Sequence, residues 1–518
     1  MQTFRIILVV LIAAQATGSA SADVTLPAVF SDHMVLQHGR PLPIWGWAEA
    51  GEKVTVSIAG RSASERAASD GRWEVRLAAL APGGPHVLTV KGANSLTIGD
   101  VLIGDVWLCS GQSNMAMAVR SAMNSEQEQA AANYPQIRHF KTASLAIPEP
   151  QDRCEGSWAV CSPETVAAFT ATGYFFGREL HEQLDVPIGL INSSWGGTAV
   201  EAWTSWSAQE DLKPIKPLHK EWAGKVAAYD VDEARAQLEQ NLERWKGRVE
   251  KARAAGRKPP RRPTLAADPA VNPNRPANLF NGMIHPLIPY AIRGAIWYQG
   301  ERNTRGDISK SYGLQLATMI YDWRSRWGYE FPFAWVQLPN FTEPQAEPVE
   351  STGWVMVREG MLKTLDLSKT GMAITVDIGE AGDIHPKNKQ DVGLRLAAWA
   401  LADVYGKPGV PSGPVYESMV RKGDSIVVHF ANVGGKLMAK GDELAGFAVA
   451  GADRKFVWAD AKIAGETVVV SSAEVKAPVA VRYAWAPNPN CNLYSSAGLP
   501  ASPFRTDDWP IELDPNRR

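Results

Sequence analysis

The stretch VLIGDVWLCSGQSNM, residues 101–115, carries the pattern that decides the fold. Two short apolar runs, 101–104 and 106–109, lead into a serine-containing turn. Continuous apolar runs of this kind are typical of strands buried on both faces of a parallel sheet. Further runs follow at 188–191, 294–298, 333–336 and 372–376. Helical patterns separate some of them, at 173–184, 313–327 and 392–405. This alternation predicts an α/β domain with a central parallel sheet over residues 101–410.

The regions on either side of this domain have a different pattern. Residues 23–100 show short alternating segments broken by Gly, Pro and Asp, which predicts an antiparallel β-sandwich. Residues 411–518 return to a β-type pattern and predict a C-terminal β-rich domain. Within the α/β domain, residues 207–278 are predicted to be a helical insertion. Its helix at 234–255 has few large apolar residues and should be solvated, and the basic, proline-rich segment 256–263 is predicted to be a surface loop.

The N-terminus has the pattern of a secretory signal peptide. Arg5 precedes the apolar run 6–14, and Ala20-Ser21-Ala22 supplies the small residues that a signal peptidase requires. We therefore expect cleavage before Asp23 and an exported protein, periplasmic or extracellular. No later stretch reaches the roughly 18 apolar residues that span a bilayer, so no membrane association is expected after cleavage. Export permits disulfides among the four cysteines, and Cys154 and Cys161 are close enough in sequence to pair across a short loop.

Composition narrows the function classes. The formal net charge of −2 over 518 residues gives no electrostatic reason to expect nucleic acid as a partner. The 19 tryptophans are compatible with a sugar-binding cleft and equally with a packed core. The chain contains no HExxH motif, no CxxC pair and no phosphate-binding glycine-rich loop, so neither a metal nor an organic cofactor is predicted.

The candidate nucleophile is Ser113. It lies in a tight turn directly after the run 106–109, at the carboxyl edge of the predicted sheet, where open α/β folds place their sites. A purely structural turn is the alternative. A serine hydroxyl needs a base, and His385 has the best context, since it follows the run 372–376 in a loop that also carries Asp383. His285 is the rival histidine.

Acyl transfer also needs N–H donors directed at the oxygen that becomes an oxyanion. Gly196-Gly197 follows the run 188–191, and Asn303 follows the run 294–298. A plain turn and a helix N-cap are the alternative interpretations of these two features. Together with Ser113 and His385, four strand ends each present one component of an acyl-transfer site.

These motifs resemble the SGNH hydrolase superfamily and, within it, the sialate O-acetylesterase family. The resemblance covers nearly the whole chain after the predicted signal peptide. The matching segments are 30–37, 104–115, 194–198, 297–303, 384–389, 482–485 and 498–507. The resemblance implies a flavodoxin-like, SGNH-hydrolase parallel-sheet domain.

The resemblance also implies roles for individual residues. Ser113 is the nucleophile, His385 the base and Asp383 its acid partner; the oxyanion donors are the Ser113 N–H, the N–H of Gly197 (chosen over Gly196) and the Asn303 side chain. Two features depart from the family pattern. Gly382 occupies the position three before the histidine, where the superfamily usually has the acid, and Arg302 occupies a position that is often small.

The function implied is that of a serine esterase, a carboxylic ester hydrolase that removes O-acetyl groups from a carbohydrate through an acetyl-enzyme on Ser113. The family points to O-acetylated sialic acid as the substrate. Acetylated xylan or xyloglucan is the alternative substrate, and a non-catalytic carbohydrate-binding protein on an esterase scaffold is the alternative function.

Overall fold

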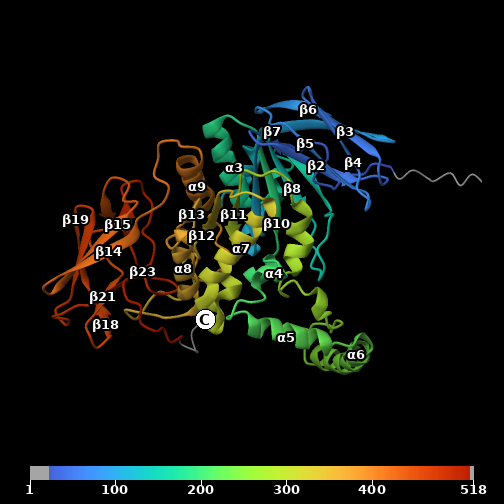
Figure 1. Ribbon diagram of the computed structural model, residues 1–518. Coiled ribbons are helices and arrows are strands. Elements are labelled where there is room, and N and C mark those ends of the chain that lie inside the picture. Colours follow the sequence, from blue (N-terminus) through green and yellow to red (C-terminus); the bar gives the residue numbers. More distant parts are fainter. Residues whose placement is uncertain (1–22, 514–518) are drawn as a thin grey trace, which may run out of the picture.

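The structure is a computed structural model that describes residues 23–513. The predicted signal peptide, residues 1–22, lies outside the described residues. None of the helices within residues 23–513 has the length and the apolar composition of a membrane span. Figure 1 shows a central sheet with helices, a β-region at each end of the chain, and a helical arm.

The central sheet carries the parallel strands that the apolar runs predict. In spatial order these are β13 (Thr370–Ala373), β12 (Phe333–Val336), β11 (Gly294–Tyr298), β7 (Ser95–Gly111), β10 (Ile188–Ser194) and β8 (Tyr134–Thr142). Strand β9 (Gly156–Cys161) adds to the β8 edge in the antiparallel sense. The predicted α/β class with a parallel sheet is confirmed.

Helices cover both faces of this sheet. Trp107 and Cys109 of β7 lie in one buried cluster with α3 (Ala171–Leu184) and α9 (Lys389–Trp399). Leu108, between them, lies in the opposite cluster with α7 (Tyr312–Trp327) and α8 (Gly353–Lys363). Successive side chains of a strand point to opposite faces, so both faces of β7 must be apolar. The short helices α1 (Ser113–Ala116) and α2 (Ser125–Ala130) follow β7.

Strand β7 also belongs to the N-terminal β-region. Its first part pairs with β6 (Gly83–Lys91) and β1 (Val35–Gln37), and its last part pairs with β10 and β11. The domain boundary expected at residue 100 therefore lies inside one continuous strand. The remaining N-terminal strands are β3 (Lys53–Ile58), which pairs with β4 (Arg61–Arg66) and β6, and β2 (Leu42–Trp47), which pairs with β5 (Arg72–Leu77).

Asp105 is the one charged residue in the apolar stretch of β7, and it is 1% exposed. Its carboxylate accepts hydrogen bonds from Arg293 Nε at 2.7 Å, Gln37 Nε2 at 2.8 Å and the Tyr405 hydroxyl at 2.9 Å, and it lies 3.0 Å from His38 Nε2. Burial would raise the pKa of Asp105, but the hydrogen bond from His38 and the charge of Arg293 lower it to about 2. The charged residue between the two predicted runs, Asp105, is thus a buried carboxylate in ion pairs with Arg293 and His38, and the two runs form one strand.

The C-terminal region is rich in short antiparallel strands that share one buried cluster. One sheet has the order β14 (Val415–Lys422), β15 (Ser425–Ala431), β20 (Thr467–Ser471) and β19 (Asp460–Ala464). Another has β18 (Phe456–Trp458), β17 (Phe447–Ala450), β21 (Ala480–Tyr483) and β23 (Phe504–Arg505), and β16 (Leu437–Ala439) pairs with β22 (Leu493–Ser495).

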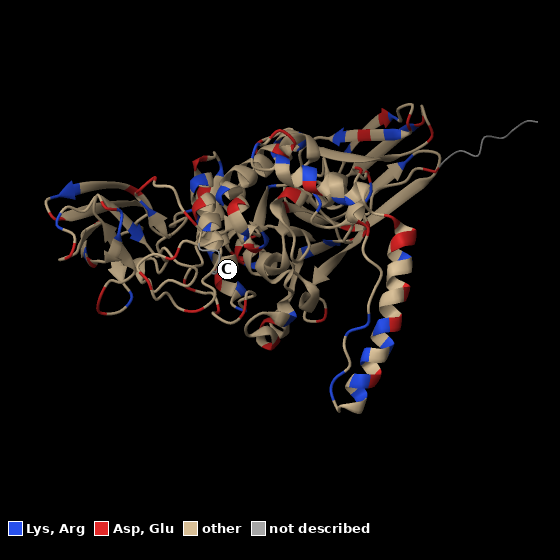
Figure 2. Cartoon of the chain, turned by 90° about the horizontal axis from the view of Figure 1, so that it is seen from below, with Lys and Arg blue, Asp and Glu red and all other residues tan. Residues whose placement is uncertain are grey.

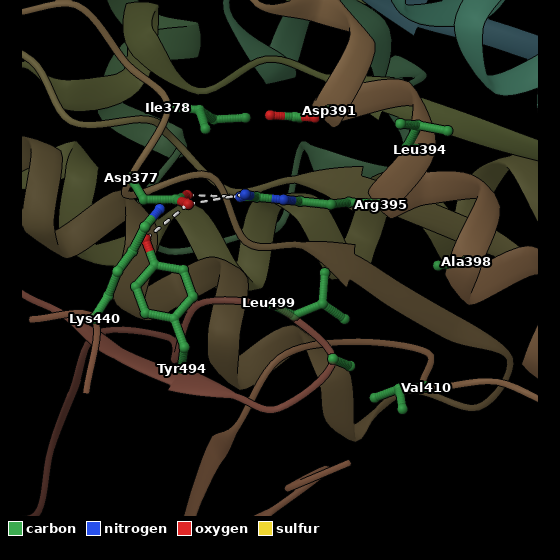
Figure 3. Close-up of a pocket in the computed structure, with 12 residues that line it drawn as sticks. Asp377, Ile378, Asp391, Leu394, Arg395, Ala398, Val410, Lys440, Tyr494 and Leu499 are labelled. Atoms are coloured by element: carbon green, nitrogen blue, oxygen red, sulfur yellow. Dashed lines mark hydrogen bonds and ion pairs between the residues drawn. The ribbon is translucent and has the colours of Figure 1, made fainter. Parts of the chain in front are cut away.

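This region contacts α9 and the loop after β13 beside a cavity of about 480 Å³ (Figure 3). Arg395 of α9 forms a bidentate ion pair with Asp377 at 2.6 and 2.8 Å. Tyr494 of β22 donates its hydroxyl to the same carboxylate at 3.0 Å. Asp377 lies near the start of the loop that leads to His385, so the C-terminal region anchors that loop.

The predicted insertion contains α4 (Trp206–Gln209), α5 (Lys216–Ala227) and α6 (Val231–Ala254). Only Val249 of α6 is buried, as expected for a solvated helix. Figure 2 shows this helix and the following loop projecting from the rest of the chain, with basic residues near the far end.

Two compositional expectations are settled by burial. Thirteen of the 19 tryptophans are buried, which shows that the high tryptophan content largely builds the core; eight are fully buried, namely Trp45, Trp73, Trp107, Trp203, Trp297, Trp323, Trp335 and Trp485. All four cysteines are free, so the pairing that the short separation of Cys154 and Cys161 permits does not form. The two thiols lie in different hydrophobic clusters, Cys154 with the β7–α7 cluster and Cys161 with the β7–α3 cluster.

Asp105 gives a prediction about stability. We expect Asp105→Asn to lower the free energy of unfolding at neutral pH by about 3 kcal/mol, because Arg293 loses the charge of its buried partner. The pKa of Asp105 lies below its ordinary value of 3.8, so the ionised carboxylate stabilises the fold above pH 3.8 and this contribution is lost as the pH falls toward 2. Urea unfolding should therefore show the difference narrowing in acid. The exposed control Asp424→Asn should change stability by less than about 0.5 kcal/mol, and an equal loss in both variants would contradict the prediction.

Candidate active site

The end of β7 places Ser113. Gly111, the last residue of the strand, has φ 135°, and a side chain there would collide with the backbone of Tyr298 on β11. Only glycine lets the chain turn this close to the neighbouring strand. Ser113 then opens α1 and is partly exposed. Its Oγ lies 2.8 Å from Nε2 of His385.

His385 comes from the loop between β13 and α9. Strand β13 ends at Ala373, before the end of the apolar run 372–376, and the loop then crosses the carboxyl edge of the sheet. The Ser113–His385 contact has the geometry required of a nucleophile and its base. The rival His285 lies elsewhere, with Nδ1 2.9 Å from the Gln151 carbonyl oxygen and its ring against Phe280.

Asp383 lies beside His385 without a hydrogen bond to its ring. Oδ1 of Asp383 accepts the backbone N–H of His385 at 2.9 Å and lies 3.6 Å from Nδ1. The two side chains are 46% and 43% exposed, so water screens their interaction. The carboxylate shapes the turn around the histidine more directly than it orients the imidazole.

The two glycines after β10 are placed differently. A Cβ on Gly196 would lie 3.2 Å from Cβ of Ser113, so this residue packs directly on the nucleophile. Gly197 has φ 74°, its missing side chain would face open space, and its carbonyl oxygen accepts from Asn274 Nδ2 at 3.2 Å. Of the predicted pair, Gly196 is the residue that packs against Ser113, and a Cβ there would make a tight contact. The role predicted for the Gly197 N–H stays a prediction.

Asn303 is 1% exposed and its carboxamide is fixed on both sides. Oδ1 accepts from Gln299 Nε2 at 2.7 Å and from the Val200 N–H at 3.0 Å, while Nδ2 donates to Glu201 at 2.8 Å. Asn303 lies within the short turn Glu301–Thr304 and does not cap it. Among the described residues, the second N–H of Nδ2 has no acceptor, so it can serve as the predicted oxyanion donor.

A group of buried polar residues beneath Ser113 was missed by the sequence analysis. The Glu301 carboxylate accepts from Gln112 and from Asn114 Nδ2, and Lys389 Nζ donates to Asn114 Oδ1 at 2.8 Å. Burial raises the pKa of Glu301 and lowers that of Lys389 to about 7, while each charge opposes the shift of the other. Their only sequence signal is proximity to the predicted site residues.

The arrangement suits acyl transfer. It places a serine hydroxyl within hydrogen-bond reach of a base at one edge of the sheet, where the N–H donors of the oxyanion are predicted. We expect a fluorophosphonate probe to label Ser113 covalently and Ser113→Ala to abolish labelling. His385→Ala should slow labelling by about 10²–10⁴-fold, because the serine loses its base. Mass spectrometry of the labelled peptide and the rate of labelling measure both effects. His285→Gln should keep the wild-type rate; a slow His285 variant beside a fast His385 variant would refute the assignment.

Asp383 gives a second prediction. Because its carboxylate is exposed and 3.6 Å from Nδ1, we expect Asp383→Asn to lower kcat/KM for an activated ester by about 10-fold, against about 10⁴-fold for a buried triad acid. Steady-state kinetics measures the ratio. A loss as large as that caused by His385→Ala would show that Asp383 orients the imidazole during turnover.

Several known proteins are similar to this chain in sequence, and one of them in structure. Residues 103–240 match the family model described as carbohydrate esterase, sialic acid-specific acetylesterase. The sialate O-acetylesterases of Mus musculus and Homo sapiens are each 29% identical, over 96% and 94% of this chain and 97% and 94% of those proteins. A carbohydrate acetylesterase from Xanthomonas citri has a crystal structure with a TM-score of 0.79 and 38% identity, covering 94% of this chain and 100% of that one. The chain therefore belongs to the carbohydrate acetylesterases, the family of the Xanthomonas citri relative.

Proposed function

We propose that this protein is a serine esterase that removes O-acetyl groups from a carbohydrate through an acetyl-enzyme on Ser113. The observation that carries the proposal is the 2.8 Å contact between Ser113 Oγ and His385 Nε2 at the carboxyl edge of the sheet. An intact nucleophile and base argue against a binding protein on an inactive scaffold.

The reaction has two steps. His385 accepts the proton of Ser113 Oγ as that oxygen attacks the acetyl carbonyl, and the Ser113 N–H, a glycine N–H of the 196–197 turn and Asn303 Nδ2 stabilise the oxyanion. Protonated His385 then returns the proton to the departing sugar oxygen, which leaves as a hydroxyl and forms the acetyl-enzyme. Water, deprotonated by His385, attacks the acetyl group, and acetate leaves as Ser113 regains its proton.

O-acetylated sialic acid is the proposed substrate. The family model and the mammalian relatives carry sialic acid or sialate in their descriptions, whereas the Xanthomonas citri relative is described only as a carbohydrate acetylesterase. Acetylated xylan and xyloglucan are therefore the substrates to compare. The N-terminal sequence pattern supports an exported enzyme, periplasmic or extracellular, that would meet such sugars outside the cytoplasm.

The proposal predicts two measurements. Wild type should hydrolyse p-nitrophenyl acetate, and Ser113→Ala should lose at least about 10³-fold in kcat, because no acetyl-enzyme can form. Acetate release should be faster from O-acetylated sialic acid than from acetylated xylan or xyloglucan. Ser121→Ala, an exposed serine shortly after the nucleophile, should retain full activity. Full activity in Ser113→Ala would overturn the mechanism, and preferential release from xylan would overturn the choice of sugar.

A further inference from the structure

The two peptide groups beside His385 are held from within the protein. The carbonyl oxygen of Ile384, before the histidine, accepts from Asn114 Nδ2 at 3.0 Å. The carbonyl oxygen of Pro386, after it, accepts from Lys389 Nζ at 2.5 Å. The backbone on both sides of the base is therefore fixed by side chains that are themselves fully buried.

These two donors are also bonded to each other. Lys389 Nζ donates to Asn114 Oδ1 at 2.8 Å, and Asn114 directly follows the nucleophile Ser113. Lys389 is placed by its helix, because it is the first residue of α9 and the Asn388 side chain caps that helix by accepting the Asp391 N–H. One short chain of hydrogen bonds thus joins the nucleophile turn to both flanks of the base.

The charge of this lysine is balanced under the site. Glu301, also buried, accepts from the same Asn114 carboxamide, and the Lys389 ammonium lies 5.3 Å from the centre of the Tyr298 ring. A buried ammonium persists only when it is paired and hydrogen-bonded. Because such a group is costly, its bonds to the two catalytic segments call for a functional explanation.

The imidazole of His385 lacks the usual means of orientation. Its Nδ1 is 3.6 Å from Asp383, and the two side chains are nearly half exposed. A base misplaced by about 1 Å can cost on the order of 10²-fold in rate. Other contacts must therefore fix the position of His385. The hydrogen bonds from Asn114 and Lys389 to the backbone on either side of it can do so, because they are buried and short.

We propose that Lys389, acting with Asn114, is a positioning residue that holds His385 in register with Ser113 through the carbonyl groups of Ile384 and Pro386. This inference rests on the proposed esterase function. It assigns to the buried lysine a role that triad enzymes give to the acid.

The test is Lys389→Met, which keeps the length of the side chain and removes its donors. We expect kcat for p-nitrophenyl acetate to fall by about 10²-fold while KM changes less than about two-fold, because the acetyl ester does not contact the lysine. The rate of fluorophosphonate labelling should fall in parallel, whereas the final labelled fraction should stay at the wild-type level. The matched control is Lys387→Met, an exposed lysine of the same loop, which should retain wild-type kinetics.

A second variant removes the risk of misfolding. Lys389→Met alone leaves Glu301 without its balancing charge, so Glu301→Gln/Lys389→Met removes both buried charges. The double variant should recover most of the loss in unfolding midpoint. It should keep the kcat defect relative to Glu301→Gln alone, because Pro386 still lacks its donor.

The outcomes separate the possibilities. Wild-type kcat in a folded Lys389→Met or double variant would overturn the positioning role. A labelled fraction that falls in proportion to kcat would also overturn it, because the lysine would then only stabilise the fold. If wild type has no esterase activity, or if Ser113→Ala matches wild type, the proposed function itself fails.

Discussion

A strand in the middle of a sheet needs a hydrogen-bonding partner on each side, and β7 meets this requirement with different strands along its two halves. Its early residues pair with β6 and β1, and its later residues pair with β10 and β11. Asp105, at the change-over, is held by Arg293 and Gln37. The N-terminal β-region is therefore continuous with the strand that ends at the nucleophile, and Ser113 stands on a support that is paired along its length.

The site assembles because parallel strands bring their carboxyl ends to one edge. Ser113 follows β7, Gly196 follows β10, Asn303 follows β11 and His385 follows β13, so four segments distant in sequence meet there. These contacts arise from the order of the strands in the sheet and not from closeness in the sequence. Gly111 and Gly196 allow the segments to approach one another closely. A side chain at 111 would collide with the Tyr298 backbone, and one at 196 would crowd Ser113.

Features that depend on local patterns could be predicted from the sequence, and features that depend on burial across the fold could not. The runs at 188–191 and 294–298 are apolar throughout because both faces of those strands are covered, so they identify the sheet and place Asn303. The sequence left the pairing of Cys154 and Cys161 open, because a short separation says nothing about which hydrophobic cluster each thiol enters. The Glu301–Asn114–Lys389 group gave no periodic signal, since its members come from three segments distant in sequence that only the fold brings together.

The loop that carries the base is anchored at both ends, which explains how a half-exposed histidine can be precise. Near its start, Asp377 is held by Arg395 of α9 and by Tyr494 of the C-terminal β-region. At its end, Lys389 is held by Asn114 beneath the nucleophile. Arg395 and Lys389 both belong to α9. The helix therefore bonds the loop at Asp377 and at Pro386, and His385 lies between these two residues in the sequence. Through Tyr494, the C-terminal region constrains the segment on which proton transfer depends.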